Sequence, residues 1–452
     1  MATRVMRGLV STLGLAVLLA GLGGYIYYES KRPPASDGGT VVPKAFTIKP
    51  AEIEQFTVTS AGGETTTVVK QGDRWQITSP VEAKADDLAM SAMTRELSGA
   101  EVQRVVDLAP SDLKQYGLEP PRVAVVAKVA GGKDDGKDGV RLLLGDKTVT
   151  GRDMYAKTGS DPKVFLASSS LDSTFNKSTF DLRDKAVVTV DRDAIDFVEV
   201  KSDGRVVQVA RTGTDWDMKA PLQLRADAGV VGDLLSKLIA LRMKSVGPVE
   251  AADLKKDGLE RPAYSVTIGN GSARSVLQIG GEGPDSTLYA RDASRPIVFT
   301  IDRAIADDLK KEAWEFRRKD VFDFETLDAM RLEIAQSGRT SVYEKGADAQ
   351  GSWREVSPTA RAVDSTKVQT VLSKLSYLRA VAFVDPKHAK TGMDAPDISV
   401  VVKSDAGKKE EQVKLAKAGG EQFASRSGWP DVGRLDANAY KLLTEALADL
   451  AK

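Results

Sequence analysis

The segment DRWQITSPVEAKADDL, residues 73–88, contains a spacing that returns twice later in the chain. A tryptophan is followed five residues later by a proline, and six residues after that by an aspartate. The three copies are Trp75, Pro80 and Asp86; Trp216, Pro221 and Asp227; and Trp353, Pro358 and Asp364. Because the whole pattern returns in order, it indicates one structural unit that is repeated three times.

Each aspartate precedes a segment with helical periodicity. Apolar residues follow the aspartate at offsets of 4, 7 and 11, and this spacing predicts a helix with one buried face. An aspartate at that position is typical of a helix N-cap, where its side chain accepts hydrogen bonds from free amides of the first turn. The apolar positions are Met90, Met93 and Leu97; Val231, Leu234 and Leu238; and Val368, Val371 and Leu375.

Alternating apolar residues before each tryptophan predict a β-hairpin at the start of every repeat. We expect the tryptophan to end the second strand of the hairpin and to pack over the core. The proline then stops the strand, and the aspartate starts the helix. The triplet therefore predicts a scaffold role, not a chemical site.

A second motif, G-[LM]-[ED]-x-P, follows each predicted helix. Glycine permits a positive φ and proline favours an extended segment, so the motif predicts a turn before two further strands. A later strand carries Tyr155, Tyr289 or Phe423, and a short helix is expected to close each unit. The motif's glycines and prolines are Gly117 and Pro121, Gly258 and Pro262, and Gly392 and Pro396.

These patterns predict an α+β protein with three tandem repeats, each a mainly antiparallel sheet packed by helices, and one N-terminal transmembrane helix. The related segments FDLRDKAV and WEFRRKDV are the joints that end the first two repeats. The predicted divisions are an anchor at 1–32, a linker at 33–44, and repeat domains at 45–184, 185–318 and 319–452.

Residues 8–28 form an uncharged apolar run of 21 residues, which is long enough as a helix to cross a bilayer of about 30 Å. Basic residues precede the run and tyrosines end it, as at a membrane interface. The alternative is a cleaved signal peptide ending near Gly21 or Gly23. We favour an uncleaved anchor because the run continues past those glycines to full spanning length. The basic residues before the run favour an orientation with residues 33 onward outside the cytoplasm.

Small residues recur every four positions along this run. Thr12, Ala16, Ala20 and Gly24 would form a seam that lets another transmembrane helix approach closely. The alternative is that these small residues have no contact role, because glycine and alanine are common in any anchor helix.

The composition excludes several kinds of chemistry. Lys plus Arg and Asp plus Glu both total 64, so no net charge attracts nucleic acid. The chain has no cysteine and a single histidine, His388, which excludes thiolate sites, hydrolytic triads and histidine-rich metal centres.

Five short stretches resemble chemical motifs but have simpler explanations. Ser111 with Lys114 matches S-x-x-K, and K-T-G occurs at 157–159 and 390–392, as in penicillin-binding enzymes. The repeat places Ala252 at the position of Ser111, and no S-D-N is present. The stretches KDDGKDG (133–139) and GGEGPD (280–285) lack the spacing of a calcium loop or a phosphate loop. We assign no catalytic, cofactor or metal residue.

The paired motifs, the N-terminal anchor and the LRDK joint resemble the domain-of-unknown-function 4340 family of bacterial envelope proteins. The resemblance covers residues 45–452, although Met393 replaces leucine in the third repeat and no glycine there matches Gly145 and Gly280. It implies an accessory part of an ABC-type export system of the kind associated with gliding motility.

The expected function is therefore a non-enzymatic, membrane-anchored extracytoplasmic scaffold or accessory subunit of an ABC-type envelope export complex. Its expected partners are the membrane and integral-membrane transporter subunits, and its expected location is the inner membrane with the repeats in the periplasm. The alternative is a periplasmic lipid- or glycan-binding protein, which an apolar cavity large enough for an acyl chain would favour.

Overall fold

The computed structural model describes residues 43–132, 139–159, 161–247, 253–295, 297–346, 351–387 and 389–452. The predicted span at 8–28 with its seam at Thr12, Ala16, Ala20 and Gly24 lies outside these ranges. So do His388 and most of the 133–139 loop. No helix within the described ranges combines the length and apolarity needed to cross a bilayer.

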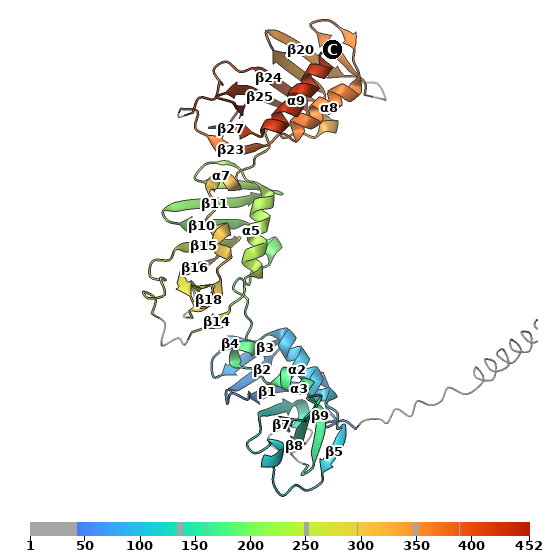
Figure 1. The fold of residues 1–452 in the computed structure, drawn as a ribbon, viewed down its shortest axis with the longest axis vertical. Coiled ribbons are helices and arrows are strands. Elements are labelled where there is room, and N and C mark those ends of the chain that lie inside the picture. Colours follow the sequence, from blue (N-terminus) through green and yellow to red (C-terminus); the bar gives the residue numbers. More distant parts are fainter. Residues whose placement is uncertain are drawn as a thin grey trace, which may run out of the picture. The chain divides into compact units, whose positions relative to one another are not determined.

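The described residues form three nine-stranded antiparallel sheets with one strand order (Figure 1). The α+β class and the threefold repetition are therefore confirmed. By contact density the chain divides into two compact units, Met1–Lys185 and Ala186–Lys452. The first unit holds one sheet and the second unit holds two.

The first sheet has the order β4-β3-β2-β1-β6-β7-β8-β9-β5. Its strands are β1 (Ile53–Thr59), β2 (Thr65–Gln71), β3 (Arg74–Ser79), β4 (Ala83–Lys84), β5 (Arg104–Asp107), β6 (Val123–Val129), β7 (Val140–Lys147), β8 (Asp153–Thr158) and β9 (Val164–Ser168). Its helices are α2 (Asp87–Gly99), α3 (Ser170–Phe175) and α4 (Thr179–Leu182).

The second sheet repeats this order as β13-β12-β11-β10-β15-β16-β17-β18-β14. The strands are β10 (Phe197–Ser202), β11 (Arg205–Thr212), β12 (Asp215–Ala220), β13 (Leu224–Arg225), β14 (Ser245–Val246), β15 (Tyr264–Asn270), β16 (Ala273–Gly283), β17 (Thr287–Asp292) and β18 (Phe299–Asp302). The helices are α5 (Ala228–Ala240), α6 (Ile305–Leu309) and α7 (Ala313–Phe316).

The third sheet has the order β22-β21-β20-β19-β24-β25-β26-β27-β23. The strands are β19 (Arg331–Gln336), β20 (Arg339–Lys345), β21 (Trp353–Ser357), β22 (Arg361–Ala362), β23 (Ala380–Val384), β24 (Ile398–Ser404), β25 (Lys409–Ala418), β26 (Glu421–Arg426) and β27 (Val432–Leu435). Helices α8 (Ser365–Ser376) and α9 (Ala437–Leu450) pack side by side (Figure 1).

Alternation along the central strands decides which face of each sheet is buried. In β6 the residues Val123, Val125, Ala127 and Val129 are buried, and the residues between them are more exposed. Strand β24 has the same alternation. One face of each strand therefore supplies the core against which the helices pack.

The predicted two-stranded opening was wrong in one respect. Each repeat opens with three strands, and the tryptophan lies near the start of the third strand: Trp75 in β3, Trp216 in β12 and Trp353 in β21. In the first repeat Gly72 has a φ of 62° and turns the chain between β2 and β3. Because this turn is only two residues long, the sequence has no polar stretch that separates the two strands, and they resemble a single strand.

The closing helices also differ from the prediction. The segment DRAIADDLKKEAWEF forms two short helices, α6 and α7, where a single helix was expected. In the third repeat the closing helix α9 is a single helix of 14 residues.

Candidate functional site

The repeated tryptophans lie inside the repeats that contain them. Trp75 contacts Phe56 in the first core, with ring centroids 5.9 Å apart. Trp216 is buried under the guanidinium of Arg211, 5.3 Å from its ring centre. Trp353 is buried in the core of the third repeat. The tryptophans belong to three separate cores and do not form a shared site.

The repeated aspartates are helix N-caps. Oδ1 of Asp86 accepts hydrogen bonds from the amides of Leu88 at 2.9 Å and Ala89 at 3.1 Å. Asp227 accepts likewise from the second and third residues of α5, and Asp364 accepts from the amide of Thr366 at 2.8 Å. Pro80, Pro221 and Pro358 follow strands β3, β12 and β21, each through a cis peptide bond.

The G-[LM]-[ED]-x-P motif forms a turn against a neighbouring strand. Gly117, Gly258 and Gly392 have φ values of 65°, 70° and 72°, where glycine is favoured. The residues Pro121, Pro262 and Pro396 come shortly before β6, β15 and β24. The repeated tryptophans, aspartates, glycines and prolines therefore have structural roles in cores, helix caps and turns.

The third repeat has no glycine equivalent to Gly145 and Gly280, and it also lacks the β-bulge found at that position in the other two repeats. A Cβ on Gly145 would lie 2.1 Å from the carbonyl oxygen of Tyr116, and a Cβ on Gly280 would lie 2.2 Å from that of Asp257. In both repeats the strand register shifts next to this glycine. Ala416 occupies the position in the third repeat, where the pairing of β25 with β26 is regular. Regular pairing there removes the need for glycine.

The two joints fold back on the repeats that they end. In the first unit the amide of Asp86 donates to the carbonyl of Leu182 at 2.8 Å. In the second unit the amide of Asp227 donates to the carbonyl of Phe316, also at 2.8 Å. The second joint, residues 314–321, continues into the third repeat, where the amide of Val321 donates to the carbonyl of Leu378 at 2.9 Å.

Arg317 is the most deeply buried basic residue of the second joint. The residue is 3% exposed, and its guanidinium lies 3.6 Å from the ring centre of Phe383 and 4.7 Å from that of Trp429. Its Nη1 donates to Asp431. Burial lowers the pKa of Arg317, and the pairing with Asp431 partly offsets this. Arg317 therefore connects the joint to an aromatic and acidic pocket of the third repeat.

The helix cap Asp227 has a second contact across this joint. Its Oδ2 accepts from Nη2 of Arg379 at 2.9 Å, while Nε of Arg379 lies 3.0 Å from Asp320. One carboxylate thus caps α5 and holds the third repeat. The sequence indicated the cap but gave no sign of Arg379.

Two cavities adjoin the second joint. One has a volume of about 290 Å³ and the other about 680 Å³, and both are lined by Arg318, Asp320 and Asp323. Arg318 pairs with Asp320 at 2.8 Å and with Asp323 at 2.6 Å. Hydrogen bonds from Lys409 and the charge of Arg318 outweigh burial and lower the pKa of Asp323. The site is therefore built from ion pairs.

The residues that resembled an enzyme motif have structural surroundings. Ser111 is exposed in a loop, and Nζ of Lys157 donates to the carbonyl oxygens of Thr158 and Asp161. The stretch 280–285 ends β16 and enters a turn. Among the residues that the structure describes, no three acidic or histidine side chains gather as a metal site.

Comparison with known proteins gives structural matches of very low similarity. A DNA polymerase sliding clamp from Pseudomonas aeruginosa with ligand is 9% identical, with 88% of this chain and 93% of that chain covered and a TM-score of 0.15. A DnaN sliding clamp from Bartonella birtlesii is 10% identical, with coverages of 87% and 93% and a TM-score of 0.15. These scores carry no argument about this chain. No curated protein sequence matches it.

The family comparison is specific. The profile described as "Domain of unknown function (DUF4340)" matches residues 75–220 and 216–396, which together span most of the chain. Both matches begin at a repeated tryptophan, so they follow the repeats described above. The chain belongs to the DUF4340 family.

Proposed function

We propose that this protein is a membrane-anchored, non-enzymatic scaffold or accessory subunit of an ABC-type envelope export complex. In this proposal residues 8–28 remain as a single-pass anchor in the inner membrane, and the repeats lie in the periplasm. Integral-membrane transporter subunits are the proposed partners.

The observation that carries this proposal is an exposed apolar surface on the third repeat. Leu327 is 82% exposed and Tyr377 is 81% exposed, and Met330 is partly exposed nearby in the chain. A hydrogen bond of 3.3 Å between Thr326 and Ser376, the residues that precede the first two, holds their segments together. Exposed apolar side chains that lie close together can mark a protein interaction site.

The architecture supports the same function. The shared motif residues serve the cores, caps and turns, so each repeat is free to vary the rest of its surface without losing the fold. Such a division between a fixed framework and a variable surface suits a protein that contacts partners.

A lipid- or glycan-binding role is the alternative, and one cavity favours it. A space of about 420 Å³ beside α5 and α6 has an apolar wall that includes Leu241 and Ile305, and its rim includes Lys237 and Lys244. Asp308 and Asp302 line the same space and pair with Lys237 at 2.6 Å and Lys244 at 3.9 Å. The volume and the apolar wall therefore suit a small ligand with an apolar part. Lipid extraction of the purified protein followed by mass spectrometry tests this alternative directly.

A crosslinked pull-down from native membranes tests the leading proposal. Leu327→Ser combined with Tyr377→Ser should reduce the recovery of a transporter subunit by about tenfold, because both exposed apolar contacts are removed. Leu442→Ser on α9 is the matched control, since Leu442 is also exposed in the same repeat. Equal recovery with all three proteins would contradict the proposed surface.

A further inference from the structure

The cavity of about 290 Å³ at the second joint collects arginines from separate parts of the chain. Arg225 comes from β13, Arg317 and Arg318 come from the joint, and Arg426 comes from β26. Asp320 and Asp323 line the same cavity. The lining thus holds four guanidinium groups and two carboxylates.

Arg317 has hydrogen-bonding capacity that the described protein does not use. Its Nη1 is taken by Asp431, whereas its Nη2 is buried and has no partner among the described residues. The rings of Phe383 and Trp429 cover part of this guanidinium. A buried N–H group of a charged side chain is stabilised further when it gains an acceptor. Arg317 lines the cavity, so an acceptor bound there would lie beside its guanidinium.

The other arginines keep donors for a ligand while they remain paired. A guanidinium has five N–H groups, and a carboxylate partner occupies only some of them. Arg426 pairs with Glu411 at 2.5 Å, and Arg318 pairs with Asp320 and Asp323. The pair between Arg225 and Asp215 is half-exposed, so Arg225 loses little by turning toward a ligand.

Repeat equivalence shows that two of the four arginines, Arg318 and Arg426, are special to this joint, whereas Arg317 corresponds to Arg183 and Arg225 to Lys84. Arg426 opposes Val413 in the sheet, and the equivalent pair in the second repeat is Asp292 opposite Leu277. Counting from the paired WEFRRKDV and FDLRDKAV segments, the equivalent of Arg318 is Asp184. Arg426 thus stands where the second repeat has an aspartate and the first repeat has Thr158, and Arg318 stands where the first joint has Asp184. The fold itself does not require them.

We propose that this cavity binds a phosphate group. Guanidinium groups that approach from three segments match the oxygens of a tetrahedral phosphate better than the two coplanar oxygens of a carboxylate. The volume suits a single phosphate group or a small molecule that carries one. The same group is available from free phosphate or from a phospholipid headgroup.

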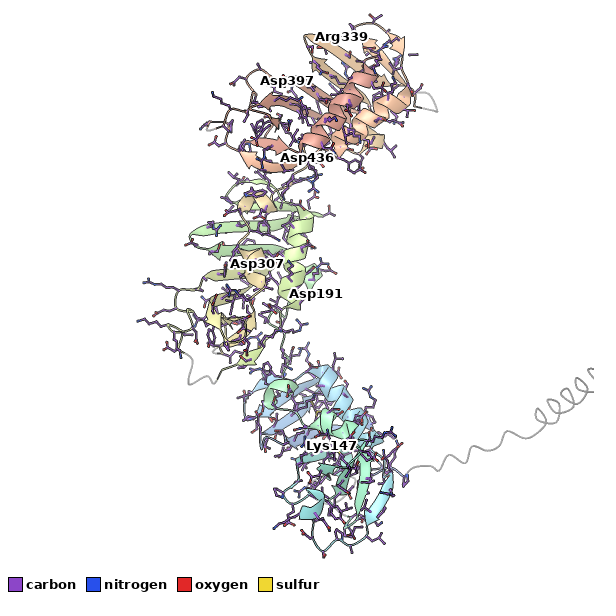
Figure 2. The ribbon with its side chains drawn as sticks, in the orientation of Figure 1. Lys147, Asp191, Asp307, Arg339, Asp397 and Asp436 are labelled. Carbon is purple, nitrogen blue, oxygen red and sulfur yellow. The ribbon has the colours of Figure 1, made fainter. Side chains whose placement is uncertain are left out.

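Isothermal titration of the full-length protein with inorganic phosphate, at constant ionic strength, tests the proposal. Wild type should bind one phosphate per chain, and Arg426→Gln and Arg225→Gln should each weaken binding by about tenfold or more. Arg339→Gln is the matched control, because Arg339 (labelled in Figure 2) is an exposed arginine of the same repeat outside the cavity lining. It should bind phosphate as wild type does.

Two results would overturn the proposal. One is the absence of saturable phosphate binding in wild type, which would leave water as the partner of Arg317. The other is unchanged binding in Arg426→Gln and Arg225→Gln, with circular dichroism showing that both variants are folded. Competition with short-chain phosphatidylglycerol then separates the sources, since tighter binding than that of phosphate identifies a lipid headgroup and equal or weaker binding identifies free phosphate.

Discussion

At the scale of single residues, the repeated tryptophans act through burial. Trp216→Ala removes a large aromatic side chain from the core of the second repeat, and we expect a loss of about 3–5 kcal/mol in the free energy of unfolding. Urea denaturation followed by circular dichroism measures this loss. A change below about 1 kcal/mol would show that the core does not depend on this residue.

Asp227 combines two roles that substitutions can separate. Asn is also a good N-cap, so Asp227→Asn should keep the cap and lose only the ion pair with Arg379, at a cost of less than about 1 kcal/mol. Asp227→Ala should lose the cap as well and cost about 1 kcal/mol more. Denaturation of both variants measures the difference, and equal losses would show that the cap contributes nothing.

Much of this residue-level detail is local in the sequence, which is why it could be predicted. A cap such as Asp86 acts on amides two and three residues away, and Gly117 acts within one turn. The contacts of Arg317 could not be predicted in this way. Asp431 is 114 residues further along the chain, and no periodicity or motif connects the two.

At the scale of elements, the β-bulge of the first two repeats explains why both have a glycine at the same position. In Gly280→Ala the new Cβ would meet the carbonyl oxygen of Asp257, and we expect a loss of about 1–3 kcal/mol from the resulting strain. Ala416→Gly, at the equivalent position, should cost only about 0.5–1 kcal/mol. Thermal unfolding compares the two, and a smaller loss for Gly280→Ala would refute the proposed clash.

Helix α3 is held to its sheet by an ion-pair cluster that responds to pH. Asp172 accepts from Arg122 and pairs at 2.8 Å with Lys147, which Figure 2 labels. Burial raises the pKa of Asp172, but the hydrogen bonds from Lys147 and Arg122 outweigh it and hold the pKa below its ordinary value.

The direction of this shift fixes the pH dependence. Because the pKa of Asp172 is lower in the folded state, its contribution is present above the unfolded pKa of about 3.9 and is lost as the pH falls through the folded pKa. Asp172→Asn should therefore flatten the stability profile below about pH 5. Denaturant titrations from pH 3 to 7 measure the profile, and parallel profiles for variant and wild type would exclude Asp172 as a source.

The element boundaries show where sequence patterns fail. Apolar offsets located α2, α5 and α8 because one buried face leaves a regular trace. The turn between β2 and β3 leaves little trace in the sequence because only two residues, Gly72 and Asp73, separate the strands. Strand β13 has only two residues, too few to show an alternation of apolar and polar side chains.

At the scale of the whole molecule, the proposed anchor at residues 8–28 and its proposed seam make a separate prediction. Ala16→Leu combined with Ala20→Leu keeps the segment apolar but fills the groove between small residues. We expect membrane retention to persist while co-purification with a transporter subunit weakens. Membrane fractionation and quantitative pull-down measure the two effects, and unchanged co-purification would exclude the seam as a contact.

The repeated architecture could be read from the sequence because three copies reinforced each weak signal. The exposed pair Leu327 and Tyr377 could not be predicted, since these residues lie 50 positions apart in the sequence and neither belongs to the repeated motifs. Their exposure becomes visible only when the fold is complete.

Site-specific photo-crosslinking in native membranes tests the scaffold proposal most directly. A photoreactive phenylalanine analogue at Tyr377 should crosslink to an integral-membrane transporter subunit identified by mass spectrometry, and the same analogue at Leu442 should not. Crosslinking at Tyr377 only to lipid, or to no protein beyond what Leu442 captures, would contradict the scaffold proposal.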